Sequence, residues 1–99
     1  MLNITTNKEE DRLLVGLEGR LDTVTSQDLE KTLQDSLDGV NELVLDFDGL
    51  EYISSAGLRV LLANQKIMMK RGGMKLVRVH DEIMEIMDIT GFSEILTIE

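Results

Sequence analysis

Three consecutive apolar residues, Leu43, Val44 and Leu45, limit the folds open to this chain more than any other feature. Such a run is typical of a strand at the centre of a sheet, or of one covered on both faces. Helical spacing lies on either side of it, since leucines recur every four residues over 29–37 and an apolar face recurs over 58–71. A helix therefore lies between this strand and the strand before it, and another between this strand and the strand after it. Strands joined through a helix are predicted to be parallel, with right-handed crossovers.

The remaining segments extend this alternation of strands and helices. Strands are predicted over 2–6, 12–18, 43–47 and 74–79, and a possible last strand over 95–98. Thr23 or Thr25 is the predicted N-cap of the first helix, and Asp81 that of a third helix over 82–89. Asp48-Gly49 is predicted to be a turn, and the charged segment 7–11 favours an antiparallel hairpin. One α/β domain over 1–99 follows, with a mixed, mostly parallel sheet, an N-terminal antiparallel hairpin and packed helices.

Composition and charge exclude several classes of protein. The chain has 19 acidic and 10 basic residues and a net charge of −9, which opposes binding to nucleic acid and to anionic membranes. It contains no cysteine, so it has neither disulfides nor a thiolate metal site. Residues 1–6 lack the basic head and apolar run of a signal peptide. A cytoplasmic protein is therefore expected.

Two hydroxyl groups and two very small residues lie where the strand gives way to the second helix: Ser54, Ser55, Ala56 and Gly57. Serine is a preferred N-cap, because its oxygen accepts a hydrogen bond from the first helical turn. The small Ala-Gly pair would let another molecule approach the backbone closely. The two serines therefore either cap the helix only or form part of a contact surface.

Candidates for catalysis are few. His80 is the only histidine, and it could share a sheet edge with Asp46. Asp46 and Asp48 end a predicted parallel strand, where ligands bind in α/β proteins, so a magnesium-assisted phospho-aspartate site is an alternative to two solvated turn carboxylates. The other acidic residues that such a site needs are missing from the first hairpin.

Three segments together resemble the anti-sigma factor antagonists, which are bacterial stand-alone STAS domains. Residues 17–22 resemble the second strand of the family and its Gly-x-Leu-Asp turn. Residues 45–58 resemble the third strand and the phosphorylation loop, and residues 88–92 resemble the end of the C-terminal helix. The resemblance covers essentially the whole chain and implies a single STAS-like domain.

The resemblance also implies a function: a non-enzymatic regulatory protein that exchanges partners, with no cofactor, no metal and no catalytic residue. Its unmodified form would bind an anti-sigma factor that is also a serine kinase, and sigma factor would be released. Phosphorylation by that kinase would stop the binding, and a PP2C-type phosphatase would restore it. The protein would be a monomer or weak dimer that contacts neither nucleic acid nor membrane directly.

Alignment on Gly57 and Leu58 carries the phosphorylated serine of the family onto Ser55. Sporulation-type members have Asp immediately before that serine, whereas this chain has Ser54, which is therefore the reserve choice. The expected partner contacts are Asp22, Thr23, Ser54, Ser55, Ala56, Gly57, Leu58 and Arg59. Asp22 could orient the serine, contact the kinase or cap the first helix. A STAS scaffold that is never phosphorylated is the alternative.

Overall fold

The computed structural model describes all residues 1–99. Its elements follow in the order β1 (Leu2–Glu9), β2 (Arg12–Leu21), α1 (Thr25–Ser36), β3 (Glu42–Ile53), α2 (Ser55–Met69), β4 (Met74–Val77), α3 (Asp81–Thr90) and the short 3₁₀ helix η1 (Phe92–Glu94). None of the helices is both long enough and apolar enough to cross a membrane.

The four strands form one mixed sheet in the order β1-β2-β3-β4. β1 and β2 pair antiparallel, and β2–β3 and β3–β4 pair parallel. The predicted antiparallel hairpin and the parallel pairing of the later strands are therefore confirmed. β3 lies between two parallel neighbours, as expected for its run of apolar residues.

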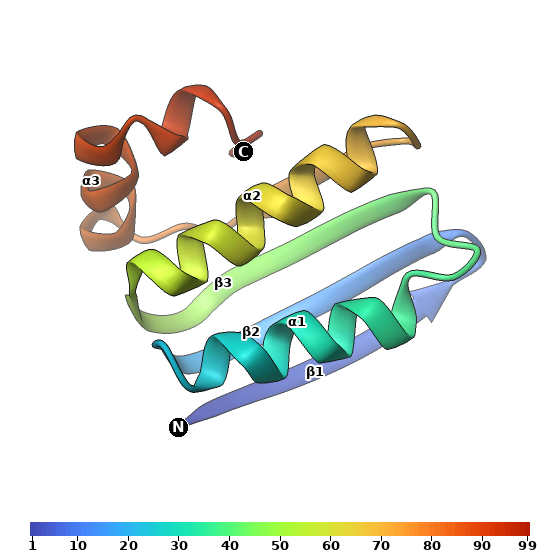
Figure 1. The fold of residues 1–99 in the computed structure, drawn as a ribbon, viewed down its shortest axis with the longest axis horizontal. Helices are drawn as coiled ribbons and strands as arrows, with labels where there is room; N and C mark the ends of the chain where they lie inside the picture. The colour runs from blue at the N-terminus through green and yellow to red at the C-terminus, as the bar shows by residue number, and fades with distance from the viewer.

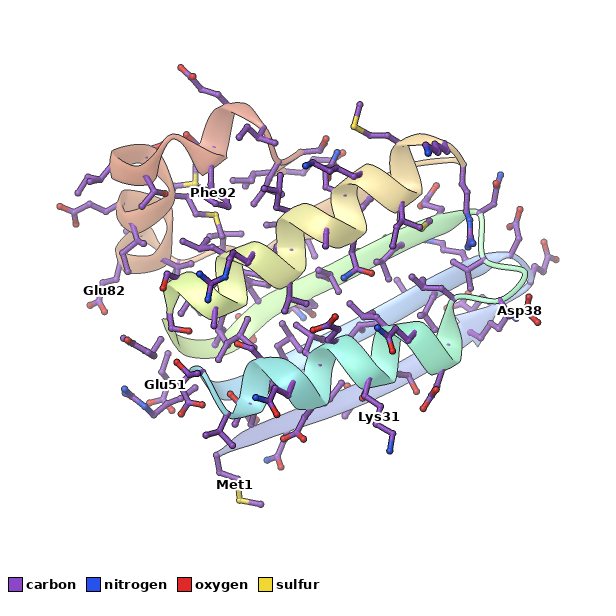
Figure 2. The ribbon with its side chains drawn as sticks, viewed as in Figure 1. Met1, Lys31, Asp38, Glu51, Glu82 and Phe92 are labelled. Carbon is purple, nitrogen blue, oxygen red and sulfur yellow. The ribbon has the colours of Figure 1, made fainter.

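α1 and α2 lie side by side on one face of the sheet, and both begin at the same end of it (Figure 1). Leu29 and Leu33 of α1 are completely buried, as are Leu43, Leu45 and Phe47 of β3. α3 and η1 lie beyond α2, on the side away from α1 (Figure 1). Polar side chains such as those of Lys31 and Glu82 point outward (Figure 2). The helices thus bury the apolar face of the sheet and present both N-termini at one end.

The predicted turn at Asp48-Gly49 is wrong, because β3 continues through it to Ile53. Gly16 pairs with Asp46 and Glu18 pairs with Gly49, so β3 contains one extra residue between these pairs. A Cβ atom on Gly49 would lie 3.0 Å from Cγ of Glu18. Glycine therefore permits a close approach of β2 at this bulge, and it does not end the strand.

The predicted boundaries of α2 are also wrong at both ends. α2 begins at Ser55 and not at Leu58, because Ser54 caps it, and it ends at Met69. Arg71 lies beyond α2, where its Nη1 donates hydrogen bonds to the carbonyl oxygens of Leu37 at 2.7 Å and Val40 at 3.0 Å. It therefore joins the end of α2 to the segment that follows α1.

The C-terminal third is less regular than predicted. β4 ends at Val77, because Arg78 adopts a left-handed conformation with φ 54°. α3 runs from Asp81 to Thr90, so the prediction of Asp81 as N-cap is wrong: His80 precedes the helix without a side-chain cap, and Gly91 ends it at φ 82°. The possible last strand is only an isolated bridge between Leu76 and Ile98, because the chain after α3 folds into η1.

Candidate functional site

Ser54 joins β3 to α2 and is held there by three hydrogen bonds. Its backbone N–H donates to the carbonyl oxygen of Leu21 at 2.8 Å, and its own carbonyl oxygen accepts from the N–H of Leu58 at 3.0 Å. Its hydroxyl oxygen accepts from the N–H of Gly57 at 3.3 Å. Ser54 is half-buried and is the N-cap of α2, so its hydroxyl already has a structural role.

Ser55 is the first residue of α2 and its side chain is exposed. Its hydroxyl makes no hydrogen bond within the chain, in contrast to that of Ser54. Glu51, shortly before the two serines, lies at the end of the molecule where α1 also begins (Figure 2). Of the two adjacent serines, only Ser55 therefore offers a free hydroxyl to a second molecule.

Gly57 and Leu58 attach the start of α2 to the core. A Cβ atom on Gly57 would lie 2.8 Å from Cγ of Leu21 and 3.0 Å from Cγ1 of Ile53, so only glycine fits without displacement. The side chain of Leu58 is 4 % exposed. Both residues were expected to contact a partner, but their burial leaves them a supporting role beneath Ser55 and Ala56.

Asp22 binds the turn that leads into α1, and the prediction of Thr23 or Thr25 as N-cap is wrong, because α1 begins at Thr25 after Val24. Its Oδ1 accepts hydrogen bonds from the N–H groups of Val24 at 3.1 Å and Thr25 at 2.9 Å. The hydroxyl oxygen of Thr25 accepts in return from the N–H of Asp22 at 2.8 Å. The hydrogen bonds from Thr25 hold the pKa of Asp22 below its ordinary value.

A groove of about 330 Å³ runs between α1 and α2 from the end that bears the serines. Its lining comprises Thr23, Ser26, Gln27 and Glu30 from the α1 side and Ala56, Arg59, Val60, Ala63 and Asn64 from α2. Thr23, Ala56 and Arg59, all predicted contacts, thus line one concave surface next to Ser55. The hydrogen bond from Ser54 N–H to Leu21 brings these two loops together.

One exposed apolar residue at this end was not among the predicted contacts. Val24 is 72 % exposed, although it is apolar. Val24 lies five residues before Leu29, so it falls outside the four-residue repeat of the buried face of α1. An apolar residue outside that repeat indicates an exposed apolar side chain. We refer to Thr23, Val24, Ser55, Ala56 and Arg59 together as the serine surface.

The carboxylates Asp46 and Asp48 lie within β3 and not in a solvated turn. Asp46 forms a bidentate ion pair with Arg78, including an Oδ1–Nε distance of 3.1 Å, and the hydrogen bonds from Arg78 lower the pKa of Asp46. His80 contacts the carbonyl oxygen of Asp48 through Nε2. The charge of Asp46 is thus balanced by Arg78, and Asp46 does not pair with His80. Neither Ser54 nor Ser55 contacts these charged side chains. No group of three or more His, Cys, Asp or Glu side chains is arranged to hold a metal ion.

Comparison with known proteins finds relatives that agree, in fold and in family, with the resemblance seen in the sequence. BtrV of Bordetella bronchiseptica is 32 % identical over 98 % of this chain and 85 % of its own length. The anti-sigma-B factor antagonist of Bacillus subtilis is 26 % identical over 98 % of this chain and 90 % of its own length.

Two solved structures show how closely the fold agrees. An anti-sigma factor antagonist from Mycobacterium paratuberculosis superimposes with a TM-score of 0.88 at 22 % identity, covering 99 % of this chain and 85 % of its own. The Bacillus cell-fate determinant SpoIIAA in its phosphorylated form superimposes with a TM-score of 0.76 at 13 % identity, covering 98 % and 91 %. The sequence profile of the STAS domain matches residues 3–99, and the chain belongs to the STAS domain family.

Proposed function

We propose that this protein is an anti-sigma factor antagonist whose binding is switched off by phosphorylation of Ser55. The observation that carries the proposal is the free, exposed hydroxyl of Ser55 on the first turn of α2, next to the small side chain of Ala56. Relatives named as anti-sigma factor antagonists, and a phosphorylated member with the same fold, support it. The protein acts by binding and carries out no reaction of its own.

The modification is a phosphoryl transfer to a side chain of this chain. Oγ of Ser55 attacks the γ-phosphorus of ATP, an O–P bond forms, the bond to the β-phosphate oxygen breaks, and ADP leaves while the hydroxyl proton passes to a base of the kinase. Hydrolysis by a PP2C-type phosphatase returns the serine and releases inorganic phosphate. Each cycle therefore leaves the antagonist chemically unchanged.

The phosphate stops docking by charge and by bulk. It adds about −1.5 to −2 charges to a surface otherwise made of small and uncharged side chains around one arginine. A partner that covers Ser55 and Ala56 would have to desolvate this group without a matching pocket. Because Ser55 is exposed and Ser54 alone makes the cap, the fold itself survives the modification. The switch thus acts through the interface.

The partners in this proposal are an anti-sigma factor with serine kinase activity of the histidine-kinase-like ATPase class, and a PP2C-type phosphatase. The serine surface is the contact for the first, with Asp22 holding the start of α1 in place. We place the protein in the cytoplasm, where sigma factors act, as a monomer or weak dimer.

The first experiment maps the phosphate. The chain is incubated with ATP and the histidine-kinase-like ATPase encoded nearest to its gene, and the modified residue is located by mass spectrometry. We expect one phosphate, on Ser55, in the wild type and in Ser54→Ala, and none in Ser55→Ala. Modification of Ser54, or of a residue outside this loop, would contradict the assignment.

The second experiment tests the docking surface without a kinase reaction. Ser55→Asp places a carboxylate on the serine surface, whereas Asn41→Asp adds the same charge just before β3, at the opposite end of that strand. We expect the anti-sigma factor to bind Asn41→Asp as it binds the wild type and to bind Ser55→Asp at least tenfold more weakly. A complex that tolerates both variants equally would favour the alternative of an unphosphorylated scaffold.

A further inference from the structure

The serine surface contains the only arginine of the chain whose guanidinium has no partner within the structure. The other four make specific contacts: Arg12 with Glu42, Arg20 with the ring of Tyr52, Arg71 with two backbone carbonyl oxygens, and Arg78 with Asp46. Arg59 is exposed and forms no ion pair, hydrogen bond or ring contact. The guanidinium of Arg59 is therefore free to bind an anion.

Arg59 also has the spacing needed to reach a group attached to Ser55. The two residues are four positions apart on α2, so their Cβ atoms lie on one helical face at about 5–6 Å. Long side chains on a helix lean toward its N-terminus and cover the preceding turn. Arg59 shares the lining of the groove with Ala56, the residue that follows Ser55 in the preceding turn.

The order of charges is the favourable one. An anion placed N-terminal to a cation by four residues gives a stronger pair than the reverse order. The first turn of α2 has no acidic residue that could occupy Arg59 beforehand. A phosphate on Ser55 would accept two parallel N–H bonds from the planar guanidinium, which suits a phosphate better than an ammonium group would.

We propose that the phosphate of phosphorylated Ser55 is bound within the chain by Arg59. This inference rests on the proposed function, because it concerns the state that the kinase produces. Phosphorylation then changes the serine surface twice, since it adds a dianion and removes the one unpaired arginine from contact with a partner. Arg59 is thus a positioning residue for the switched-off form.

The test measures the second ionisation of the phosphate, about pH 6 in a free phosphoserine. Phosphoserine is incorporated at position 55 during translation, so no kinase is needed, and its ³¹P chemical shift is followed from pH 4 to 8. We expect the second ionisation constant of the phosphate to be about two- to fivefold larger with Arg59 than in Arg59→Gln. The reason is that a cation four residues away favours the dianion. Arg59→Lys should recover part of the effect.

Arg20→Gln is the matched control, because it removes a cation near the same end of the sheet that is already held over Tyr52 at 4.2 Å. A phosphate that titrates identically in the wild type and Arg59→Gln overturns the inference, as does an equal change in Arg20→Gln. The phosphate is installed directly, so a failed kinase assay leaves this titration valid. A negative titration, in turn, leaves the mapping and docking experiments as independent tests of the proposed function.

Discussion

Replacing each of the two adjacent serines by alanine should separate the serine that caps α2 from the serine that we propose to be phosphorylated. Ser54→Ala removes the oxygen that accepts a hydrogen bond from the buried Gly57 N–H, whereas Ser55→Ala removes a hydroxyl with no partner. The loss of a serine N-cap costs about 0.5–2 kcal/mol. We therefore expect a measurable loss of stability for Ser54→Ala and none for Ser55→Ala.

Two structural details decide where in that range Ser54→Ala lies. The distance of 3.3 Å is longer than the usual 2.9–3.0 Å, which points to a weak hydrogen bond. Against this, Gly57 is buried, so the N–H that loses its acceptor is poorly reached by water. We expect about 1 kcal/mol, which corresponds to a fall in Tm of about 4–8 °C for a domain of this size.

Urea unfolding followed by far-UV circular dichroism, with heat unfolding as a second readout, measures both variants. Ser54→Asp is the control that keeps an acceptor at the cap, and it should unfold close to the wild type. Ser55→Ala should stay within about 0.5 kcal/mol of the wild type, as exposed substitutions usually do. A larger loss of stability in Ser55→Ala than in Ser54→Ala would refute this assignment, because Ser55 would then be the structural serine.

Three further substitutions test the packing and the charges around the site. Gly57→Ala should destabilise the protein, because the clash with Leu21 costs about 1–3 kcal/mol and outweighs about 1 kcal/mol of gained helix propensity. A variant that is more stable than the wild type in a urea titration would contradict the close packing of Gly57. Arg71→Ala should cost about 2 kcal/mol in the same assay, because two carbonyl oxygens lose a charged donor, and a change under 0.5 kcal/mol would show that the contact is dispensable. Asp46→Asn should be less stable than the wild type at pH 7, and the difference should shrink as the pH falls through the folded pKa of Asp46. The folded pKa of Asp46 is lowered by Arg78, so its contribution is present above about pH 4 and is lost as the pH falls through the folded value. A difference from the wild type that does not depend on pH would show that the ion pair is not its cause.

Local sequence was sufficient for the order of the elements as far as α3 and for the place of the serine pair. The four-residue repeat of Leu29 and Leu33 and the apolar run at Leu43–Leu45 predicted a helix and a central strand, because both patterns follow from burying one face or two. The serine pair was predicted at a strand-to-helix junction for the same reason. These predictions depend only on residues close together in the chain.

Segment ends were harder to predict, because they depend on neighbours that are distant in sequence. The Asp48-Gly49 pair has the composition of a turn, yet β3 continues through it because β2 pairs alongside as far as Ile53. Thr23 and Thr25 are both good capping residues, but the side chain that accepts hydrogen bonds at the start of α1 is that of Asp22, next to the place where Leu21 bonds to Ser54. Local preference is weaker than these tertiary hydrogen bonds.

By itself, the sequence determined that a small hydroxyl-bearing segment begins a helix packed on a mixed sheet, since periodicity and side-chain size require no knowledge of distant contacts. Only the tertiary structure decided that Ser54 is held in a cap while Ser55 is free, that Leu58 faces the core, and that Arg59 alone among the arginines lacks a partner. The physical reason is that the exposure of a side chain and its hydrogen-bond or ion-pair partners depend on the residues around it. Many of those residues come from segments that are distant in the sequence.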